Sequence, residues 1–231
     1  MKKYLSVVLL ILSASLLFAD VPTSLQDNIK AISTIRETID PLILQIKQVQ
    51  ANDDLGRQRG FFAFKITFLS TFLTDSAFRD TPEVRRLKAT AAEFKANPDP
   101  AFFARNAYKL QETLAAAEAS LRILNGEFRT PVNAQLLVGK YDCHPVGFPD
   151  LIDEHEYAAG GKLTIKSLNI PLTGTYTIQG NRINRVYSSM GVTARSSDLV
   201  LSQDVNIFTV LTTNADNNSI VKECIRNTPA Q

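Results

Sequence analysis

The densest group of residues able to do chemistry lies in the segment YDCHPVGFPDLIDEHEY, residues 141–157. It holds both histidines of the chain together with five carboxylates. Two imidazoles beside carboxylates are a suitable ligand set for Zn²⁺ or a similar divalent ion. The segment therefore gives a candidate metal site, and its ligands would be His144, His155, Asp153 and Glu156.

The spacing within this segment argues for a plainer interpretation. It contains neither the HExxH spacing of zinc hydrolases nor the residue order of an EF-hand loop. A solvated connection between the first two strands of a β domain, without any cofactor, explains the same residues, and we favour it. Metal binding at residues 141–157 is kept as the alternative.

The two cysteines, Cys143 and Cys224, predict one disulfide if the protein is exported. The alternative is a free thiol or a metal ligand. Cys143 precedes His144, but neighbouring strand residues point to opposite faces and a bridged cysteine is no nucleophile. The sequence also lacks GxSxG, GxGxxG, Walker-type and CxxC motifs. We therefore assign no catalytic residue and expect a protein that is not an enzyme.

The N-terminus predicts export. Lys2 and Lys3 precede a mostly apolar run of 15 residues, and the small Ala19 follows it. We expect a signal peptide over 1–19, cleaved near Ala19, and a periplasmic or secreted protein; an uncleaved anchor is the alternative. Loss of the two lysines lowers the 25 basic residues to 23, equal to the 23 acidic ones, so nucleic acid is not an expected partner.

The secondary-structure elements that would position these residues fall into two parts, which differ in the spacing of their apolar residues. From about residue 23 to residue 126, apolar residues recur at three- and four-residue spacing, which is typical of amphipathic helices. Breaks at Pro, Asp, Thr and Gly predict four antiparallel helices, packed as a bundle over 22–129. The Asp40-Pro41 break is compatible with one kinked helix or with two successive helices. The apolar residues keep the same helical phase on both sides of Pro41, which favours one kinked helix.

The stretch FFAFKITFLSTFL at 61–73 contains five of the 13 phenylalanines of the chain. An aromatic stripe at helical spacing most often belongs to the core of a bundle. The alternative is a face that binds a partner or a membrane surface. The bundle is the part through which we expect contact with a protein partner or self-association, and membrane contact is the lesser hypothesis.

After Thr130-Pro131 the pattern changes to short segments rich in Val, Ile, Thr and Tyr, separated by turn residues. We expect an antiparallel β domain over 132–231, a small barrel or sandwich with one disulfide. The expected strands are Leu136–Asp142, Lys162–Ser167, Gly174–Gln179, Arg182–Tyr187, Asp198–Ser202, Val205–Thr212 and Ser219–Arg226.

Two patterns in this part, GKYDC at 139–143 and GTYTIQGNRI at 174–183, are similar to strands of small lipocalin-like barrels. The similarity consists of Gly, Tyr and alternating aliphatic residues, which many β proteins share, so we assign no family. Asn217-Asn218-Ser219 matches an N-glycosylation acceptor.

Together these patterns predict an exported α+β protein, with an N-terminal antiparallel helical bundle and a small antiparallel β domain. We expect it to be non-catalytic, with the bundle making protein contacts and the β domain serving as a recognition or structural module. The alternative is a metal-binding protein or metal-dependent enzyme centred on residues 141–157.

Overall fold

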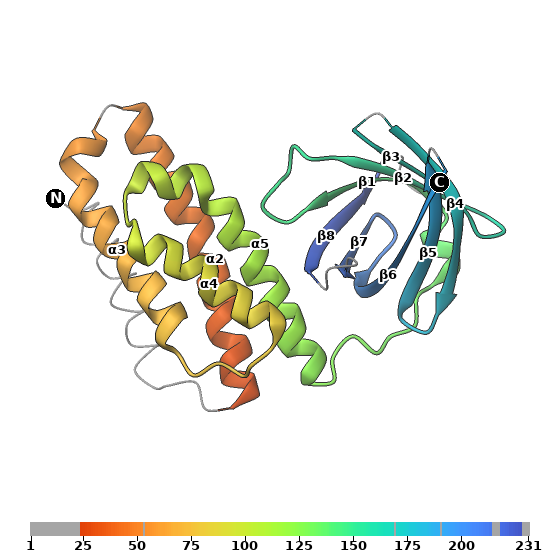
Figure 1. Ribbon diagram of the computed structural model, residues 1–231, viewed down its shortest axis with the longest axis horizontal. Helices are drawn as coiled ribbons and strands as arrows, with labels where there is room; N and C mark the ends of the chain where they lie inside the picture. The colour runs from red at the N-terminus through yellow and green to blue at the C-terminus, as the bar shows by residue number, and fades with distance from the viewer. Residues whose placement is uncertain (1–23, 53, 169, 190, 214–217, 228–231) are drawn as a thin grey trace.

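The computed structural model describes residues 24–52, 54–168, 170–189, 191–213 and 218–227. Within them the chain forms five helices followed by eight strands, as Figure 1 shows. The α+β prediction, with a helical part preceding a β domain, is confirmed. The predicted signal peptide at 1–19 and the predicted acceptor Asn217 lie outside the described residues.

Four long helices form the bundle, and three of them begin at a side-chain cap. Ser24, Thr81 and Asp99 each accept a hydrogen bond from a backbone N–H of the first helical turn. Pro41 lies inside a continuous helix, so the prediction of one helix rather than two is confirmed. The bounds are Leu25–Ala51 (α2), Leu55–Asp75 (α3), Pro82–Ala96 (α4) and Pro100–Leu124 (α5).

The bundle core is made by the apolar stripes that the sequence displays. None of the helices among the described residues combines the length and apolar character needed to cross a bilayer. The fully buried members of the core come from all four helices, so each helix depends on its neighbours for stability. They include Ile32, Ile35, Ile39, Ile46, Ile66, Leu73, Leu87, Phe94, Phe103, Leu110 and Leu114.

The phenylalanine-rich stretch divides between core and surface. Phe62 is buried with the rest of the core, whereas Phe61, Phe64 and Phe68 are exposed by 39%, 62% and 36%. The expectation that this stretch forms the bundle core therefore holds for only part of it.

The β domain is a closed barrel in which each strand pairs antiparallel with the next and β8 pairs with β1. The open choice between barrel and sandwich is thereby settled. The strands are Gly139–Pro145 (β1), Asp153–Ala158 (β2), Lys162–Ser167 (β3), Ile170–Gln179 (β4), Arg182–Ser189 (β5), Val192–Gln203 (β6), Ile207–Thr213 (β7) and Ser219–Arg226 (β8).

Two local predictions for the barrel are wrong. Residues 153–158, expected within a solvated connection, form strand β2, because inward His155 and Tyr157 alternate with outward carboxylates. Residues 134–137 form a four-residue helix, Ala134–Leu137 (α6), capped by the side chain of Asn133, so β1 begins later than expected.

A disulfide closes the barrel covalently. Cys143 on β1 lies directly opposite Cys224 on β8, and the two are bonded, which confirms the predicted pairing. The bond ties the first strand of the barrel to the last, 81 residues later.

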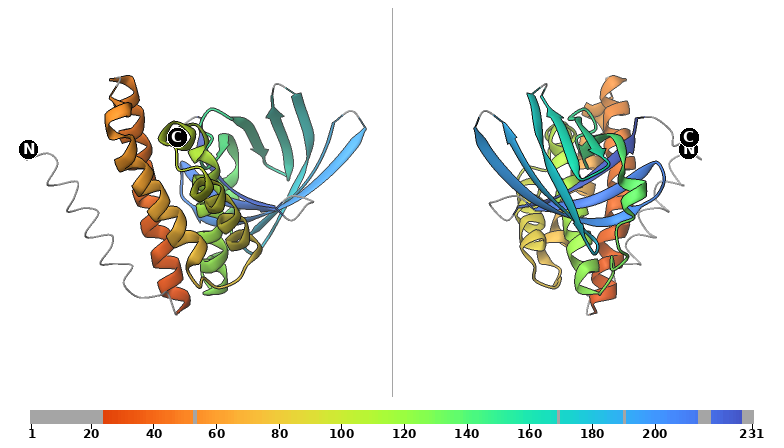
Figure 2. Two further views of the ribbon diagram at one scale, coloured as in Figure 1. Left: turned by 60° about the vertical axis from the view of Figure 1, so that its left-hand side comes forward. Right: turned by 90° about the vertical axis from the view of Figure 1, so that its right-hand side faces the viewer.

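The bundle and the barrel share helix α5. Ala115 and Ala119 of α5 pack against Leu199, Leu211 and Val221 on the outer face of β6, β7 and β8. The small alanines let the sheet come close to the helix backbone. Figures 1 and 2 show α5 between the other helices and the barrel.

Candidate functional site

The candidate site is a buried polar cluster inside the barrel, made of His155, Arg185 and Asp198. Alternation along each strand places their side chains on the inner face, in phase with Tyr157 and Ile183. Their exposed fractions are 3%, 4% and 0%. Charged residues at that depth are rare unless they are paired, so each needs a partner inside the barrel.

Arg185 connects the cluster across the barrel. Its Nη1 lies 3.1 Å from Nδ1 of His155 on β2, while its Nη2 forms an ion pair with Asp198 on β6. Arg185 itself is on β5, so the guanidinium spans the interior from one wall to the other. The positive charge of Arg185 and the negative charge of Asp198 compensate each other. Their attraction offsets the main energetic cost of burying the two side chains, which is the loss of their hydration.

His155 is held as a neutral ring. Burial, together with the positive charges of Arg185 and Lys222, lowers its pKa well below the usual 6.5. A guanidinium donates hydrogen bonds and accepts none, so Nδ1 of His155 must be the acceptor and Nε2 must carry the hydrogen. The imidazole therefore offers an N–H donor to the barrel interior and no free lone pair.

Three hydrogen-bonding atoms in or close to the cluster have no partner among the described protein atoms. They are Nε of Arg185, Oδ1 of Asp198 and the hydroxyl of Tyr157, while Oδ2 of Asp198 has only its ion pair with Arg185. Burial raises the pKa of Tyr157, which keeps the hydroxyl protonated and able to donate. Buried polar groups are nearly always hydrogen-bonded, so the two donors mark a place where an acceptor is expected, and Oδ1 of Asp198 marks a place where a donor is expected.

The disulfide lies beside His155. One nitrogen of His155 and the Sγ atoms of Cys143 and Cys224 all lie within 4.8 Å of one another. Among the described residues, this is the one group of three or more His, Cys, Asp or Glu with metal-binding spacing. Thiolates are the sulfur ligands of zinc, so this trio can hold a metal only after the disulfide is reduced.

The metal ligands predicted from the sequence are not brought together. His155 faces the interior, and Asp153 lies at its edge in an ion pair of 3.0 Å with Lys222. His144 is on the outer face of β1, one residue out of phase with Cys143, and Glu156 is on the outer face of β2, 3.8 Å from Lys140.

Arg185 and Asp198 are not among the site residues predicted from the sequence. A signal for both existed: Arg185 lies in the inward phase between Ile183 and Tyr187, and Asp198 opens the strand run DLVL. A charge at a position that alternation assigns to the core indicates a buried partner. The pairing of the two follows only from the register of β5 and β6.

One end of the barrel is closed. Helix α6 lies across it, and Arg226 donates hydrogen bonds to the backbone oxygens of Leu136, Val138 and Val205 and to the hydroxyl of Tyr141. The guanidinium of Arg226 also lies over the Tyr141 ring, 4.8 Å from its centre. We call this the closed end.

The other end, formed where β1 ends and β2 begins, is the open end. Inward side chains there, such as Leu172 and Tyr187, pack on the barrel core yet remain partly exposed. Inward residues nearer the closed end, such as Leu163 and Ile183, are buried, whereas Ile178 on β4 is partly exposed there too. The buried polar cluster therefore lies between the closed end and the partly exposed side chains of the open end.

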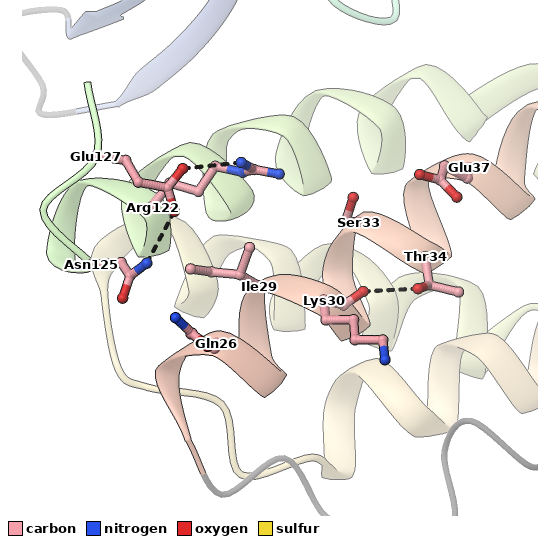
Figure 3. A pocket seen from close by; sticks show the side chains of 9 residues that line it. All are labelled: Gln26, Ile29, Lys30, Ser33, Thr34, Glu37, Arg122, Asn125 and Glu127. Atoms are coloured by element: carbon pink, nitrogen blue, oxygen red, sulfur yellow. Dashed lines mark hydrogen bonds and ion pairs between the residues drawn. The ribbon is translucent and has the colours of Figure 1, made fainter. Parts of the chain in front are cut away.

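A concave surface lies on the bundle, between α2 and the C-terminal end of α5 (Figure 3). Its most prominent charge, Arg122, is already bound by Glu118 and Glu127. The remaining lining is mostly polar, and its charged members Lys30 and Glu37 are exposed to solvent, so among the described residues this surface holds no buried polar atom without a partner. Its lining residues are Gln26, Ile29, Lys30, Ser33, Thr34, Glu37, Arg122, Asn125 and Glu127.

No known family model matches this sequence, and no curated protein is similar enough to count as a relative.

Proposed function

We propose that this protein is a non-catalytic, exported binding protein whose barrel takes a small molecule through the open end. The observation that carries the proposal is the buried polar cluster, with Nε of Arg185, Oδ1 of Asp198 and the hydroxyl of Tyr157 lacking partners. A recognition site commonly combines an apolar wall with a few polar groups that fix the orientation of the ligand.

The groups of the site define the chemistry of the ligand. The unpartnered atoms of Arg185 and Tyr157, and Nε2 of His155, are donors, so they suit an oxygen acceptor such as a carbonyl or carboxylate, whereas the unpartnered Oδ1 of Asp198 suits a donor such as a hydroxyl. Leu172 and Tyr187 at the open end suit an apolar body. The ligand is therefore amphipathic, with its oxygen-bearing end innermost.

Two further observations support the remaining parts of the proposal. His155 has no free basic nitrogen, which favours binding over general-base catalysis. The Cys143–Cys224 disulfide favours an oxidising compartment and so supports export.

The test uses 8-anilinonaphthalene-1-sulfonate, an aromatic anion with acceptor oxygens, and fluorescence titration. The matched variants are Leu172→Asn and Thr173→Asn, neighbours on β4 that point into and away from the barrel. We expect saturable binding that Leu172→Asn weakens at least tenfold and Thr173→Asn changes less than twofold. Melting curves check that both variants are folded.

The same titration with Phe68→Ser protein removes any contribution from the exposed phenylalanines of the bundle. Absence of saturable binding by the unmodified protein would count against the proposal. Equal loss in the Leu172 and Thr173 variants would place binding outside the barrel.

A metal-binding function remains the second candidate, because Cys143, Cys224 and His155 lie close together. It requires the reduced protein. Zn²⁺ added after treatment with a dithiol should bind one ion per chain, and His155→Gln should abolish that binding. No uptake by the reduced protein rules out this candidate.

A further inference from the structure

Helix α3 carries a second apolar face that the bundle does not cover. Its core side is lined by Phe62, Ile66, Leu69 and Leu73, whereas three phenylalanines on the other side are exposed. Phe61, Phe64 and Phe68 follow one another at three- and four-residue spacing, so they share one stripe of the helix. In Figures 1 and 2, α3 lies on the side of the bundle away from the barrel.

The stripe is organised as a ridge. The rings of Phe64 and Phe68 stack with centres 6.5 Å apart. Lys65 covers part of Phe61, with its amine 4.4 Å from the ring centre, and donates to Gln45 of α2. The residue before Gln45 is Leu44, which is 57% exposed. A contiguous group of large apolar side chains on a surface is typical of an interaction site.

Opposite charges stand at the two ends of the same stripe. Arg57 and Asp75 are 18 residues apart, about five helical turns and ~27 Å, which returns them to one face. Both are mostly exposed, at 91% and 62% of their side chains. Arg57 is paired with Asp54 at 3.6 Å, and Asp75 is paired with Lys95 at 3.1 Å. Surface ion pairs contribute little to stability, so Arg57 and Asp75 can readily exchange these partners for others.

This pattern is complementary to itself. The midpoint between Arg57 and Asp75 is Ile66, and Phe64 and Phe68 are placed two residues on either side of it. Two antiparallel copies of α3, related by a twofold axis at this midpoint, bring Phe64 of each copy against Phe68 of the other. The same arrangement sets each Arg57 against Asp75 of the second copy.

We propose that this face of α3 is the interface of a symmetric homodimer. The charge pattern selects a second copy of the chain over an anionic membrane, because Asp75 at one end of the stripe is repelled by anionic lipid. The contact is a single helix pair, below the size of standard stable interfaces, so the dimer is expected to dissociate in the micromolar range. The inference does not depend on ligand binding by the barrel.

Sedimentation equilibrium of the full chain at about 1–100 μM, a range set by the expected affinity, tests the interface. Phe64→Ser should weaken dimerisation at least tenfold. Leu124→Ser, which removes an exposed leucine on α5, should leave it unchanged. Both side chains are exposed, so neither change should unfold the bundle.

A charge exchange tests the twofold arrangement itself. Arg57→Glu and Asp75→Arg each place like charges together twice in a homodimer and should weaken it at least tenfold. An equal mixture of the two variants restores opposite charges at both ends, and it should dimerise within about threefold of the unmodified protein. Both substitutions suit the helix dipole, which protects the fold.

Three results would overturn the proposal. They are a monomer at every concentration, unchanged dimerisation in Phe64→Ser, and failure of the mixture to recover. Flotation with vesicles containing phosphatidylglycerol covers the membrane alternative. Binding to them that depends on Phe64, by a protein that stays monomeric, would assign the face to lipid instead.

Discussion

The neutral His155 makes the stability of the fold depend on pH in a direction that can be measured. In the unfolded chain the imidazole takes up a proton near pH 6.5, whereas burial, Arg185 and Lys222 hold its folded pKa well below that value. Below pH 6.5 the unfolded state therefore binds more protons than the folded state. The contribution of His155 to stability is complete above this pH and is lost as the pH falls toward the folded pKa.

The size of the effect follows from one proton. The free energy of unfolding should change by at most about 1.4 kcal/mol per pH unit, or about 2 kcal/mol between pH 7 and pH 5. Urea unfolding at several pH values measures it in the unmodified protein and in His155→Gln, whose amide oxygen can still accept from Arg185. The difference between the two unfolding free energies should shrink by about 2 kcal/mol over this range.

His144→Gln is the matched control, because it removes the other imidazole of the chain from the outer face of β1. This variant should still lose the His155 contribution at low pH. Parallel stability curves for the unmodified protein and His155→Gln would refute the reasoning. They would mean that His155 is protonated in the folded barrel and that its contact with Arg185 is not the one described.

Other substitutions test the packing. Tyr157→Phe removes a buried hydroxyl without a partner, so the free energy of unfolding should stay unchanged or rise by up to about 1 kcal/mol. Tyr141→Phe removes hydrogen bonds to Leu136 and Arg226 and should lower the free energy of unfolding by about 1–3 kcal/mol. Urea unfolding measures both changes. Ala115→Leu should overpack the contact between α5 and the barrel and lower the stability of the fold by about 1–3 kcal/mol. Ala89→Leu, at an exposed position of α4, is the control and should change the stability by less than about 0.5 kcal/mol. Melting temperatures compare the two variants. Replacing both cysteines by alanine should cost about 4 kcal/mol by the same assay.

The sequence was a good guide wherever one local signal decided the structure. Helices α4 and α5 begin at Thr81-Pro82 and Asp99-Pro100. In both, a capping side chain and a proline at the first helical position together mark the start of the helix. The disulfide followed from the number of cysteines and the expected compartment. Strand β2 was not predicted, because its charged residues outnumber its apolar ones, although His155 and Tyr157 keep the inward–outward alternation of a strand.

The site could not be predicted because its residues meet only through the closure of the barrel. His155 and Arg185 are 30 residues apart in sequence, on strands that are not neighbours. No local spacing records a contact of that kind. Proximity in sequence was misleading instead: His144 and His155 lie in one segment, but the phase of their strands sends them to opposite faces.

The pairing of β1 with β8 has a consequence for how this domain can be moved between proteins. The barrel begins and ends at one seam, where the backbone N–H of Asn227 donates to the oxygen of Lys140 at 2.9 Å. A unit whose two ends are adjacent can be inserted into an exposed loop of a host protein without forcing that loop apart. What such a transplant would lack is a cover for Leu199, Leu211 and Val221. A host that presents a helix with paired alanines would therefore accept the barrel best.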